Sequence, residues 1–528
     1  MTSDQPPISD RPGAPLISAT LANATLANDA IANAPAASAP AANATLTNGR
    51  AAAPAAANRS DYLTGDQPAL RIAPPPFLAD PAFAALLAAL PDARLVGGAV
   101  RDALAGGPVA DIDLATKLPP VKVMAELQRA GIRAVPTGLA HGTVTAVLDQ
   151  SGLRPSASPS GPLGGPTGAG PLDRRSVEIT TLRRDVATDG RHATVAFTDD
   201  WRQDAARRDF TINAMSMTRD GAVHDYFGGV ADLGAGVLRF VGDPSRRIAE
   251  DTLRVLRYFR FFARYAAMPP EPSVRAALQA GIPNLENLSV ERVWSELVRI
   301  LAAPDPSAAV ALMAELGILA AVIPEGADPA ALARLLAAGA PADPLLRLAA
   351  LLTGKVEPFA DRLRLSAAER QRLLDLRATP LAHPEDDDAT LRRLLADHDR
   401  VALLDRTWLA QTLLPAQRPN AAPTGIPTGM PAGARDRIPN GLTHGLSATA
   451  AEPGWVALRA RLEGLSPPVF PLEGRDVLAL GEPPGPRVGA LLRATRGWWL
   501  ARGCTDGVEA CRAELAHAIA RIDLPGGL

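Results

Sequence analysis

The chain has 528 residues, 47% of them hydrophobic, and its 54 Lys and Arg residues nearly balance 56 Asp and Glu residues, for a net charge of −2. This length predicts two or more domains, and the charge excludes the uniformly basic composition of many nucleic-acid-binding proteins. No apolar run is long enough to span a bilayer, and the N-terminus lacks the charged and apolar regions of a secretory signal, so we expect a cytoplasmic protein with no membrane partner.

Three segments have compositions that cannot bury a hydrophobic core. Residues 1–70 are rich in Ala and Asn, whereas residues 151–172 and 413–452 are rich in Gly and Pro. Such low-complexity segments bury too little apolar surface to offset the entropy lost on folding. We therefore expect a disordered N-terminal extension, a disordered insert and a disordered linker.

The segment 95–116, LVGGAVRDALAGGPVADIDLAT, is the most informative of the chain. Gly97 and Gly98 open a predicted helix, where backbone N–H groups can approach phosphate oxygens. Asp111 and Asp113 follow on a short apolar run that we predict to be a strand, so both side chains leave one face of it. Two carboxylates this close favour a cation between them, and Mg²⁺ bound by carboxylates and substrate phosphates fits. The segment predicts metal-dependent nucleotidyl transfer.

The run RRDFTINAMS at residues 207–216 admits two interpretations. Arg208 and Asp209 could form a local ion pair. Alternatively, an ionised Asp209 could accept a hydrogen bond from a ribose 2′-hydroxyl. A carboxylate buried for that purpose is left unpaired by a deoxyribose, so such a site would exclude deoxynucleotides.

A single helix is predicted over residues 250–265, which contain no Gly or Pro. Glu250, Arg254 and Arg257 form one narrow charged stripe at about 100° per residue, with Asp251 beside it. Apolar side chains cover most of the remaining surface, so the helix should be largely buried. The charged residues either form a ladder of ion pairs along the helix or line a cleft.

These motifs together resemble the class II family of CCA-adding tRNA nucleotidyltransferases and poly(A) polymerases, whose head is DNA polymerase β-like. The resemblance rests on GGxVRD followed by DxD, on RRDxxxNA and on EDxxR. Residues 470–492 further resemble the C-terminal region of alphaproteobacterial members. The implied fold class is α+β: a nucleotidyltransferase head with a small mixed sheet, followed by an all-helical neck, body and tail. The implied domains are a head at 75–235, a neck at 236–305, a body at 306–412 and a tail at 453–528.

The resemblance also implies a role for each motif. The base-reading helix belongs to the neck, and a flexible loop precedes the RRD motif. Glu178 is a further candidate carboxylate near the metal. The implied site residues are Asp111 and Asp113 for catalysis and Mg²⁺; Gly97, Gly98 and Arg101 for the triphosphate; Arg208, Asp209 and Asn213 for the sugar; Glu250, Asp251, Arg254 and Arg257 for the base; and Arg183, Asp185 and Arg191 in the flexible loop.

Donor and acceptor patterns explain how such a site could take CTP and ATP without a nucleic-acid template. Cytosine and adenine each place an exocyclic amine beside an unprotonated ring nitrogen. The Asp251 carboxylate would accept from the amine, and the Arg254 guanidinium would donate to the ring nitrogen. Uracil and guanine place a carbonyl beside a ring N–H, so the same two residues would face mismatched groups.

The implied reaction is attack of the tRNA 3′-hydroxyl on the α-phosphate of CTP, twice, and then of ATP. The expected partners of a monomeric protein are thus tRNA, CTP and ATP. Three alternatives stay open: a poly(A) polymerase or an enzyme adding only CC or only A, a small-molecule nucleotidyltransferase, and a catalytically inactive RNA-binding protein. CC-only members of the family have a shortened loop before the RRD motif. The loop of this chain is of full length, so the resemblance favours complete CCA addition.

Overall fold

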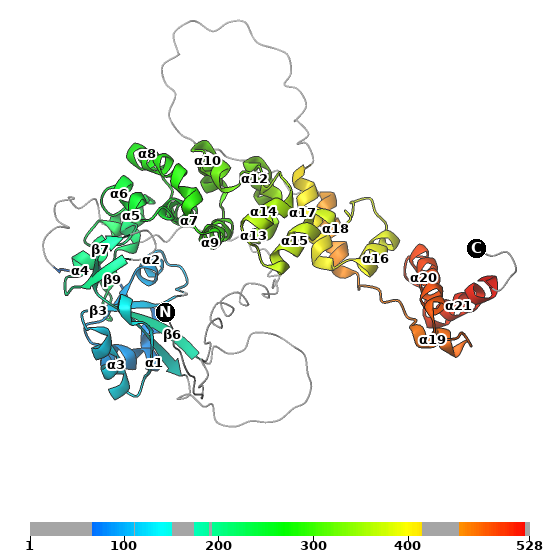
Figure 1. The fold of residues 1–528 in the computed structure, drawn as a ribbon, viewed down its shortest axis with the longest axis horizontal. Coiled ribbons are helices and arrows are strands. Elements are labelled where there is room, and N and C mark those ends of the chain that lie inside the picture. Colours follow the sequence, from blue (N-terminus) through cyan, green and yellow to red (C-terminus); the bar gives the residue numbers. More distant parts are fainter. Residues whose placement is uncertain (1–65, 110, 150–173, 189–192, 414–452, 523–528) are drawn as a thin grey trace, which may run out of the picture. The chain divides into compact units, whose positions relative to one another are not determined.

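The computed structural model describes residues 66–109, 111–149, 174–188, 193–413 and 453–522 (Figure 1). Nearly all of the three segments predicted to be disordered lies outside these ranges. The contacts divide the chain into Met1–Pro54 with Leu148–Arg175, of which few residues are described, and Ala55–Val147 with Ser176–Leu528, the unit treated below. Within the described ranges, no helix is both long and apolar enough to cross a membrane.

The head is built on a mixed eight-stranded sheet with the strand order β1-β10-β9-β2-β3-β6-β5-β4. Strand β3 runs parallel to β6 and antiparallel to β2, which places Asp113, the second aspartate of the DxD motif, between two neighbours. The predicted α+β class with a small mixed sheet is therefore confirmed. The strands are β1 (Leu70–Arg71), β2 (Arg94–Val96), β3 (Asp113–Thr116), β4 (Arg133–Gly138), β5 (Thr143–Asp149), β6 (Arg174–Thr181), β9 (Ser216–Met217) and β10 (Ala222–His224).

Short helices and a separate hairpin complete the head. Helix α1 begins at Pro81, where the Asp80 side chain accepts hydrogen bonds from the backbone N–H groups of Ala82 (3.0 Å) and Phe83 (3.2 Å), the usual arrangement at a helix N-terminus. The other elements are α2 (Gly98–Leu104), α3 (Pro120–Arg129), α4 (Trp201–Ala206), α5 (Gly229–Ala235), the 3₁₀ turns Pro76–Ala79, Leu139–His141 and Thr211–Asn213, and the two-stranded sheet of β7 (Arg183–Thr188) and β8 (Ala193–Phe197); α1 itself ends at Ala89.

All the helices and strands described after residue 243 are helices, apart from an isolated β-bridge between Ala327 and Leu352. The neck contains α6 (Pro244–Glu250), α7 (Arg254–Tyr265), α8 (Pro272–Ala280), a 3₁₀ turn (Ile282–Asn287) and α9 (Val290–Leu301). The body contains α10 (Ser307–Glu315), α11 (Ile318–Val322), α12 (Pro329–Ala337), α13 (Pro344–Leu351), α14 (Val356–Arg362), α15 (Ala367–Ala378), α16 (Asp388–Asp397) and α17 (Arg400–Leu413). After the linker come α18 (Pro453–Gly464), α19 (Gly474–Ala479), α20 (Pro486–Ala501) and α21 (Val508–Ile522).

The prediction of one continuous helix over residues 250–265 is wrong. Helix α6 ends at Glu250 and α7 begins at Arg254. Asp251 between them has extended backbone angles (φ −153°, ψ 106°), and its Oδ1 accepts a hydrogen bond from the Leu253 N–H at 3.1 Å. Aspartate side chains compete with the helical ladder in this way. The carboxylate expected to read the base therefore lies in a turn rather than on a helix.

Two domain boundaries differ from those expected. Strand β1 pairs with β10, with Leu70 opposite Val223, so the head begins before residue 75. Helix α18, which we expected in the tail, packs into the hydrophobic cluster of the body. Its apolar residues Trp455, Leu458 and Leu462 recur at helical spacing and bury one face against that cluster. The core of α19–α21 is a separate cluster around Trp499.

Candidate active site

The glycine pair forms a turn that only glycine can make easily. Gly97 precedes α2 with φ 65° and ψ −122°, a conformation that L side chains rarely adopt. A Cβ atom placed there would lie 3.1 Å from Nη1 of Arg208. The turn thus brings the glycine pair and the RRD motif, which are more than one hundred residues apart, into contact.

The structure corrects the expected placement of the aspartate pair. Strand β3 begins at Asp113, which lies opposite Val96, so Asp111 precedes the strand instead of sharing it. The reason is that β2 ends at Val96, after which Gly97 turns the chain into α2 and leaves the segment before Asp113 without an antiparallel neighbour. Asp111 and Asp113 are nonetheless both exposed.

Negative charge is concentrated around Asp113. Glu178 lies opposite it in the parallel pairing of β3 with β6, and both residues are exposed. Desolvation by the surrounding protein raises the pKa of Asp113, the carboxylates of Glu178 and Asp111 raise it further, and Arg208 lowers it. Such crowding fits a divalent cation. In the described part of the chain, no three His, Cys, Asp or Glu side chains converge as a metal-binding group, and the donor set that fits Mg²⁺ is the aspartate pair with substrate phosphates.

Both arginines of the RRD motif are held by Asp204, a residue that the sequence analysis did not single out. Asp204 lies on α4 and is 2% exposed. It accepts from Nε of Arg207 at 2.9 Å and from Nη2 of Arg208 at 3.1 Å. Burial opposes its ionisation, but the charges of Arg207 and Arg208 outweigh burial and lower the pKa of Asp204. The i,i+3 and i,i+4 spacing of these residues was the available signal.

Asp209 pairs with Arg257 of α7, and so the local Arg208–Asp209 ion pair does not form. Its Oδ2 accepts from Nε (2.8 Å) and Nη2 (2.5 Å) of Arg257. Its Oδ1 accepts from Nδ2 of Asn213 (3.1 Å) and from the backbone N–H of Phe210 (2.9 Å). Burial favours the neutral acid, but Arg257 and Asn213 outweigh it and lower the pKa of Asp209. The expected sugar-binding motif is thereby joined to the expected base-reading helix.

Arg101 connects the same network to α2. Its side chain is buried, and Nη1 donates to Oδ1 of Asn213 at 2.6 Å while Nε donates to Oδ1 of Asp102 at 2.9 Å. The guanidinium carbon lies 4.5 Å from the centre of the Tyr265 ring. Because these contacts occupy the guanidinium, they describe a positioning role within the protein, and the contact with the triphosphate stays a prediction.

The base-reading residues are held by different partners. Glu250 Oε2 accepts from Nη1 of Arg254 at 2.7 Å, so this part of the expected ladder of ion pairs forms. Arg257 takes no part in this ladder of ion pairs and binds Asp209 instead. Asp251 Oδ2 accepts from Nη2 of Arg292 on α9 at 2.8 Å. A groove lies beside these residues, between α7 and α9. Its lining includes Leu253, Arg257, Arg292, Ser295, Glu296 and Arg299.

Comparison with known proteins identifies the family. Residues 93–157 and 167–239 match the "Poly A polymerase head domain", and residues 267–328 match the "Probable RNA and SrmB- binding site of polymerase A". The mitochondrial CCA tRNA nucleotidyltransferase 1 of Mus musculus is 32% identical over 414 residues, which are 78% of this chain and 83% of that protein. The chain belongs to the class II CCA-adding tRNA nucleotidyltransferase and poly(A) polymerase family.

Further comparisons agree with this membership. The Danio rerio protein of the same name is 42% identical over 228 residues, which cover 43% of this chain and 47% of that relative. The crystal structure of the Bacillus stearothermophilus CCA-adding enzyme in complex with CTP matches with a TM-score of 0.56 and 25% identity, over 83% of this chain and 98% of that one. The order of a nucleotidyltransferase head followed by helices is therefore the architecture of the family.

The segment that the family resemblance implies to be a flexible loop includes the strands β7 and β8. Residues 189–192, Arg191 among them, lie outside the described residues. Asp185 lies in β7 opposite Val195. Arg183 begins β7, its backbone N–H donates to Oδ1 of Asp204 at 3.3 Å, and its guanidinium donates to the carbonyl of His141. The base of the hairpin is thus attached to the acid that holds the RRD arginines.

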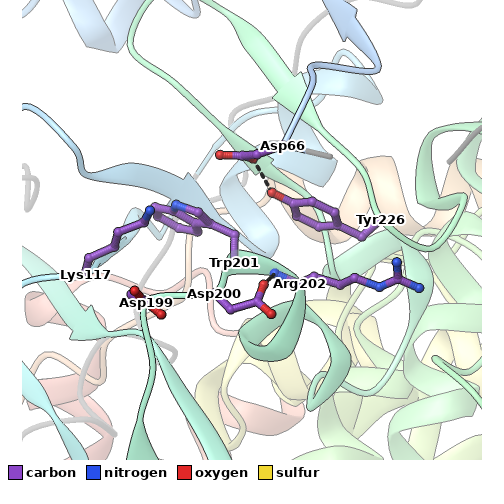
Figure 2. Close-up of a pocket in the computed structure, with 7 residues that line it drawn as sticks. All are labelled: Asp66, Lys117, Asp199, Asp200, Trp201, Arg202 and Tyr226. Atoms are coloured by element: carbon purple, nitrogen blue, oxygen red, sulfur yellow. Dashed lines mark hydrogen bonds between the residues drawn. The ribbon is translucent and has the colours of Figure 1, made fainter. Parts of the chain in front are cut away.

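The nucleotidyltransferase head also contains a pocket of about 240 Å³ that lies away from these motifs. Figure 2 shows its lining, with Lys117, which follows β3 at the opposite end from Asp113, and a hydrogen bond from Tyr226 to Asp66. Asp66 also accepts from Nη1 of Arg94 at 2.9 Å. The described residues of its lining include none of the expected site residues; they are Asp66, Lys117, Asp199, Asp200, Trp201, Arg202 and Tyr226.

Proposed function

We propose that this nucleotidyltransferase adds C, C and A to the 3′ end of tRNA from CTP and ATP without a nucleic-acid template. Relatives named CCA tRNA nucleotidyltransferase match most of the chain and support this reaction. The observation that carries the proposal is a convergence of motifs. Arg208 lies beside Gly97, its charge lowers the pKa of Asp113, and Arg257 joins the RRD motif to the base-reading helix.

The transfer itself is assigned to the end of strand β3 where Asp113 lies. The 3′-hydroxyl oxygen forms a bond to the α-phosphorus, the bond from that phosphorus to the β-phosphate oxygen breaks, and pyrophosphate leaves. Asp111 and Asp113 would hold Mg²⁺, which when bound lowers the pKa of the hydroxyl and stabilises the pyrophosphate. The Gly97–Gly98 turn offers backbone N–H groups to the phosphates, Arg208 adds positive charge at the same place, and Glu178 is a candidate third carboxylate.

Selection of the nucleotide is assigned to the hydrogen-bond network that includes Asp209 and Arg254. Arg208, Asp209 and Asn213 bind the sugar as a unit. Because four N–H groups already point at the Asp209 carboxylate, a ribose 2′-hydroxyl exchanges with one of them. Asp251 and Arg254 read the base, with Glu250 holding Arg254 in place.

The proposal is tested with a tRNA transcript that lacks its terminal CCA, incubated in Mg²⁺ with labelled CTP, labelled ATP, or both. Product length is read on a sequencing gel beside an Asp111→Ala, Asp113→Ala variant whose folding is checked by circular dichroism. We expect three added nucleotides with both substrates, two with CTP alone, and none from the double variant.

The other outcomes separate the alternatives. A long ladder with ATP alone would identify a poly(A) polymerase, and two additions with both nucleotides would identify a CC-adding enzyme. Absence of any extension would favour an RNA-binding protein. The monomeric state and cytoplasmic location expected from the sequence stay predictions, and the animal relatives are named as mitochondrial.

A further inference from the structure

The neck contains a buried carboxylate that the proposed reaction does not use. Glu296 lies on α9 and is 2% exposed. Its Oε1 accepts from Nη1 of Arg260 at 3.1 Å and from Nη1 of Arg299 at 3.4 Å, and lies 4.0 Å from Nη1 of Arg257. Its Oε2 is buried and has no hydrogen-bond partner among the described residues. An orphaned carboxylate oxygen is costly in a folded protein, so an arrangement in which it gains a donor would be favoured.

Of the three described arginines beside Glu296 (Arg257, Arg260 and Arg299), Arg257 is the one that also binds Asp209. Its guanidinium lies between two carboxylates, bound to Asp209 and just beyond hydrogen-bond distance of Glu296. The side chain is 30% exposed and lines the groove between α7 and α9, so it is not fixed on all sides. A shift of about 1 Å would bring its Nη1 within a normal N–H···O distance of Glu296.

We propose that Glu296 is a positioning residue that accepts a hydrogen bond from Nη1 of Arg257 when a ribose 2′-hydroxyl displaces one Arg257 N–H group from Asp209. This inference rests on the sugar-binding role proposed for Asp209. In the exchange, the hydroxyl replaces one of the two Arg257 N–H groups on Asp209, and Nη1 of Arg257 donates to the Glu296 carboxylate. Because Arg257 keeps its other N–H group on Asp209, the carboxylate retains its ionic partner and the ribose is admitted at little cost. A deoxyribose offers no hydroxyl, and Arg257 then stays on Asp209.

The test compares CTP with 2′-deoxy-CTP in the full chain carrying Glu296→Gln, which keeps the shape of the side chain and removes its charge. We expect the CTP over 2′-deoxy-CTP ratio of kcat/KM to fall about tenfold, chiefly through a higher KM for CTP. The CTP over UTP ratio should not change, because Asp251 and Arg254 read the base separately. Glu296→Asp, which restores the charge, should recover part of the sugar preference.

Glu291→Gln is the matched control, because Glu291 lies on the same helix and lines the same groove but is exposed and pairs with Arg364 of the body at 3.1 Å. It should leave both ratios at their wild-type values. Asp209→Asn tests the underlying role and should abolish the preference for ribose. If Glu296→Gln does not fold, the test uses Glu296→Asp instead. Its CTP over 2′-deoxy-CTP ratio of kcat/KM should fall below the wild-type value by less than tenfold.

The outcomes distinguish this inference from the proposed function. If Asp209→Asn loses the ribose preference while the Glu296 variants keep it, the inference is overturned and the sugar-binding role stands. An equal loss of kcat with every nucleotide in Glu296→Gln would also overturn it, since that result describes a structural role alone. If the wild-type chain accepts 2′-deoxy-CTP as readily as CTP, the proposed role of Asp209 fails, and the inference fails with it.

Discussion

The Arg257 guanidinium lies against the Asp209 carboxylate, with Nε 2.8 Å and Nη2 2.5 Å from Oδ2. These residues belong to separate motifs, 48 positions apart in the chain. On the other side of Asp209, Asn213 extends the network to Arg101 of α2. The glycine-turn helix, the sugar-binding motif and the base-reading helix are therefore connected by one series of hydrogen bonds, and a change in one should be felt in the others.

Arg257→Gln should destabilise the protein by about 3 kcal/mol at pH 7, because it leaves a buried Asp209 carboxylate without its ionic partner. Urea unfolding followed by circular dichroism measures this. Arg246→Gln is the control, since Arg246 is 80% exposed and pairs with Glu250 at 3.2 Å; such surface pairs contribute about 0–1 kcal/mol. An Arg257→Gln variant as stable as this control would contradict the prediction.

The same variant should show a defined pH dependence. Because the folded-state pKa of Asp209 is lowered, the stabilisation it contributes is present above the unfolded-state value of about 3.9 and is lost as the pH falls through the folded-state pKa. The difference in unfolding free energy between wild type and Arg257→Gln should therefore be largest near pH 7 and should shrink below pH 4. A constant difference across this range would argue against an ionic origin.

The chemistry of the site could be predicted from the sequence largely because its motifs are local. Gly97, Asp111, Asp113 and Asp209 stand in short runs whose spacing restricts what they can do. Their partners depend on tertiary packing. Nothing in the local sequence relates Asp209 to Arg257, so a local Arg208–Asp209 pair was equally compatible with the sequence.

Asp113→Asn should abolish nucleotide addition and yet stabilise the metal-free protein. Because desolvation by the surrounding protein and the nearby Glu178 and Asp111 raise the pKa of Asp113, its ionised form is unfavourable in the folded state. This cost is present at pH 7 and is relieved as the pH falls. Primer extension should fall about a thousandfold, or about 4 kcal/mol in the barrier. Thermal unfolding in EDTA should show a higher Tm for the variant.

Magnesium supplies an independent check of the same residue. A cation that binds only the folded protein raises its stability by about 2.7 kcal/mol at 100 times Kd. The Tm of the wild-type chain should rise with Mg²⁺, and that of Asp113→Asn should not. Lys117→Gln, at the other end of β3, is the control and should keep the wild-type response to Mg²⁺. An equal rise in Asp113→Asn would place the metal elsewhere.

Gly97→Ala should impair both stability and activity. The positive φ of Gly97 makes any side chain there cost about 1–3 kcal/mol. The added Cβ would also displace Arg208, so the KM for CTP and ATP should rise. Gly107→Ala is the matched control, since its Cβ would meet its nearest atom, the Asp102 carbonyl oxygen, at 3.7 Å, an ordinary contact distance. An unchanged KM in Gly97→Ala would mean that the turn does not set the position of Arg208.

The elements that sequence patterns could not place are those decided by distant backbone or side-chain partners. Residues Leu70–Arg71 form a strand because β10 offers an edge to them. Likewise, Asp251 in the break after Glu250 is held by Arg292 of α9, 41 positions further along the chain. The hydrophobic periodicity of residues 250–265 does not indicate this contact, because the composition of the whole segment favours a helix with an apolar face.

Asp66→Asn should loosen the start of the head. Asp66 anchors the segment before β1 by accepting from Arg94 and Tyr226. Burial opposes ionisation, but Arg94 and Tyr226 outweigh it and lower the pKa of Asp66 to about 2. The stabilisation is thus present above pH 4 and is lost as the pH falls toward 2. The Tm of the variant should lie a few degrees below wild type between pH 5 and 7.

The difference in Tm should narrow from pH 4 downward, as the wild-type carboxylate becomes protonated. Asp92→Asn, in the exposed turn before β2, is the control and should follow the wild-type curve throughout. Limited proteolysis adds a local measurement, because β1 has only β10 as a neighbour in the sheet, and loss of the Asp66 contacts should expose residues 66–72 to cleavage. Equal cleavage rates in wild type and Asp66→Asn would show that the pairing of β1 with β10 holds this segment without Asp66.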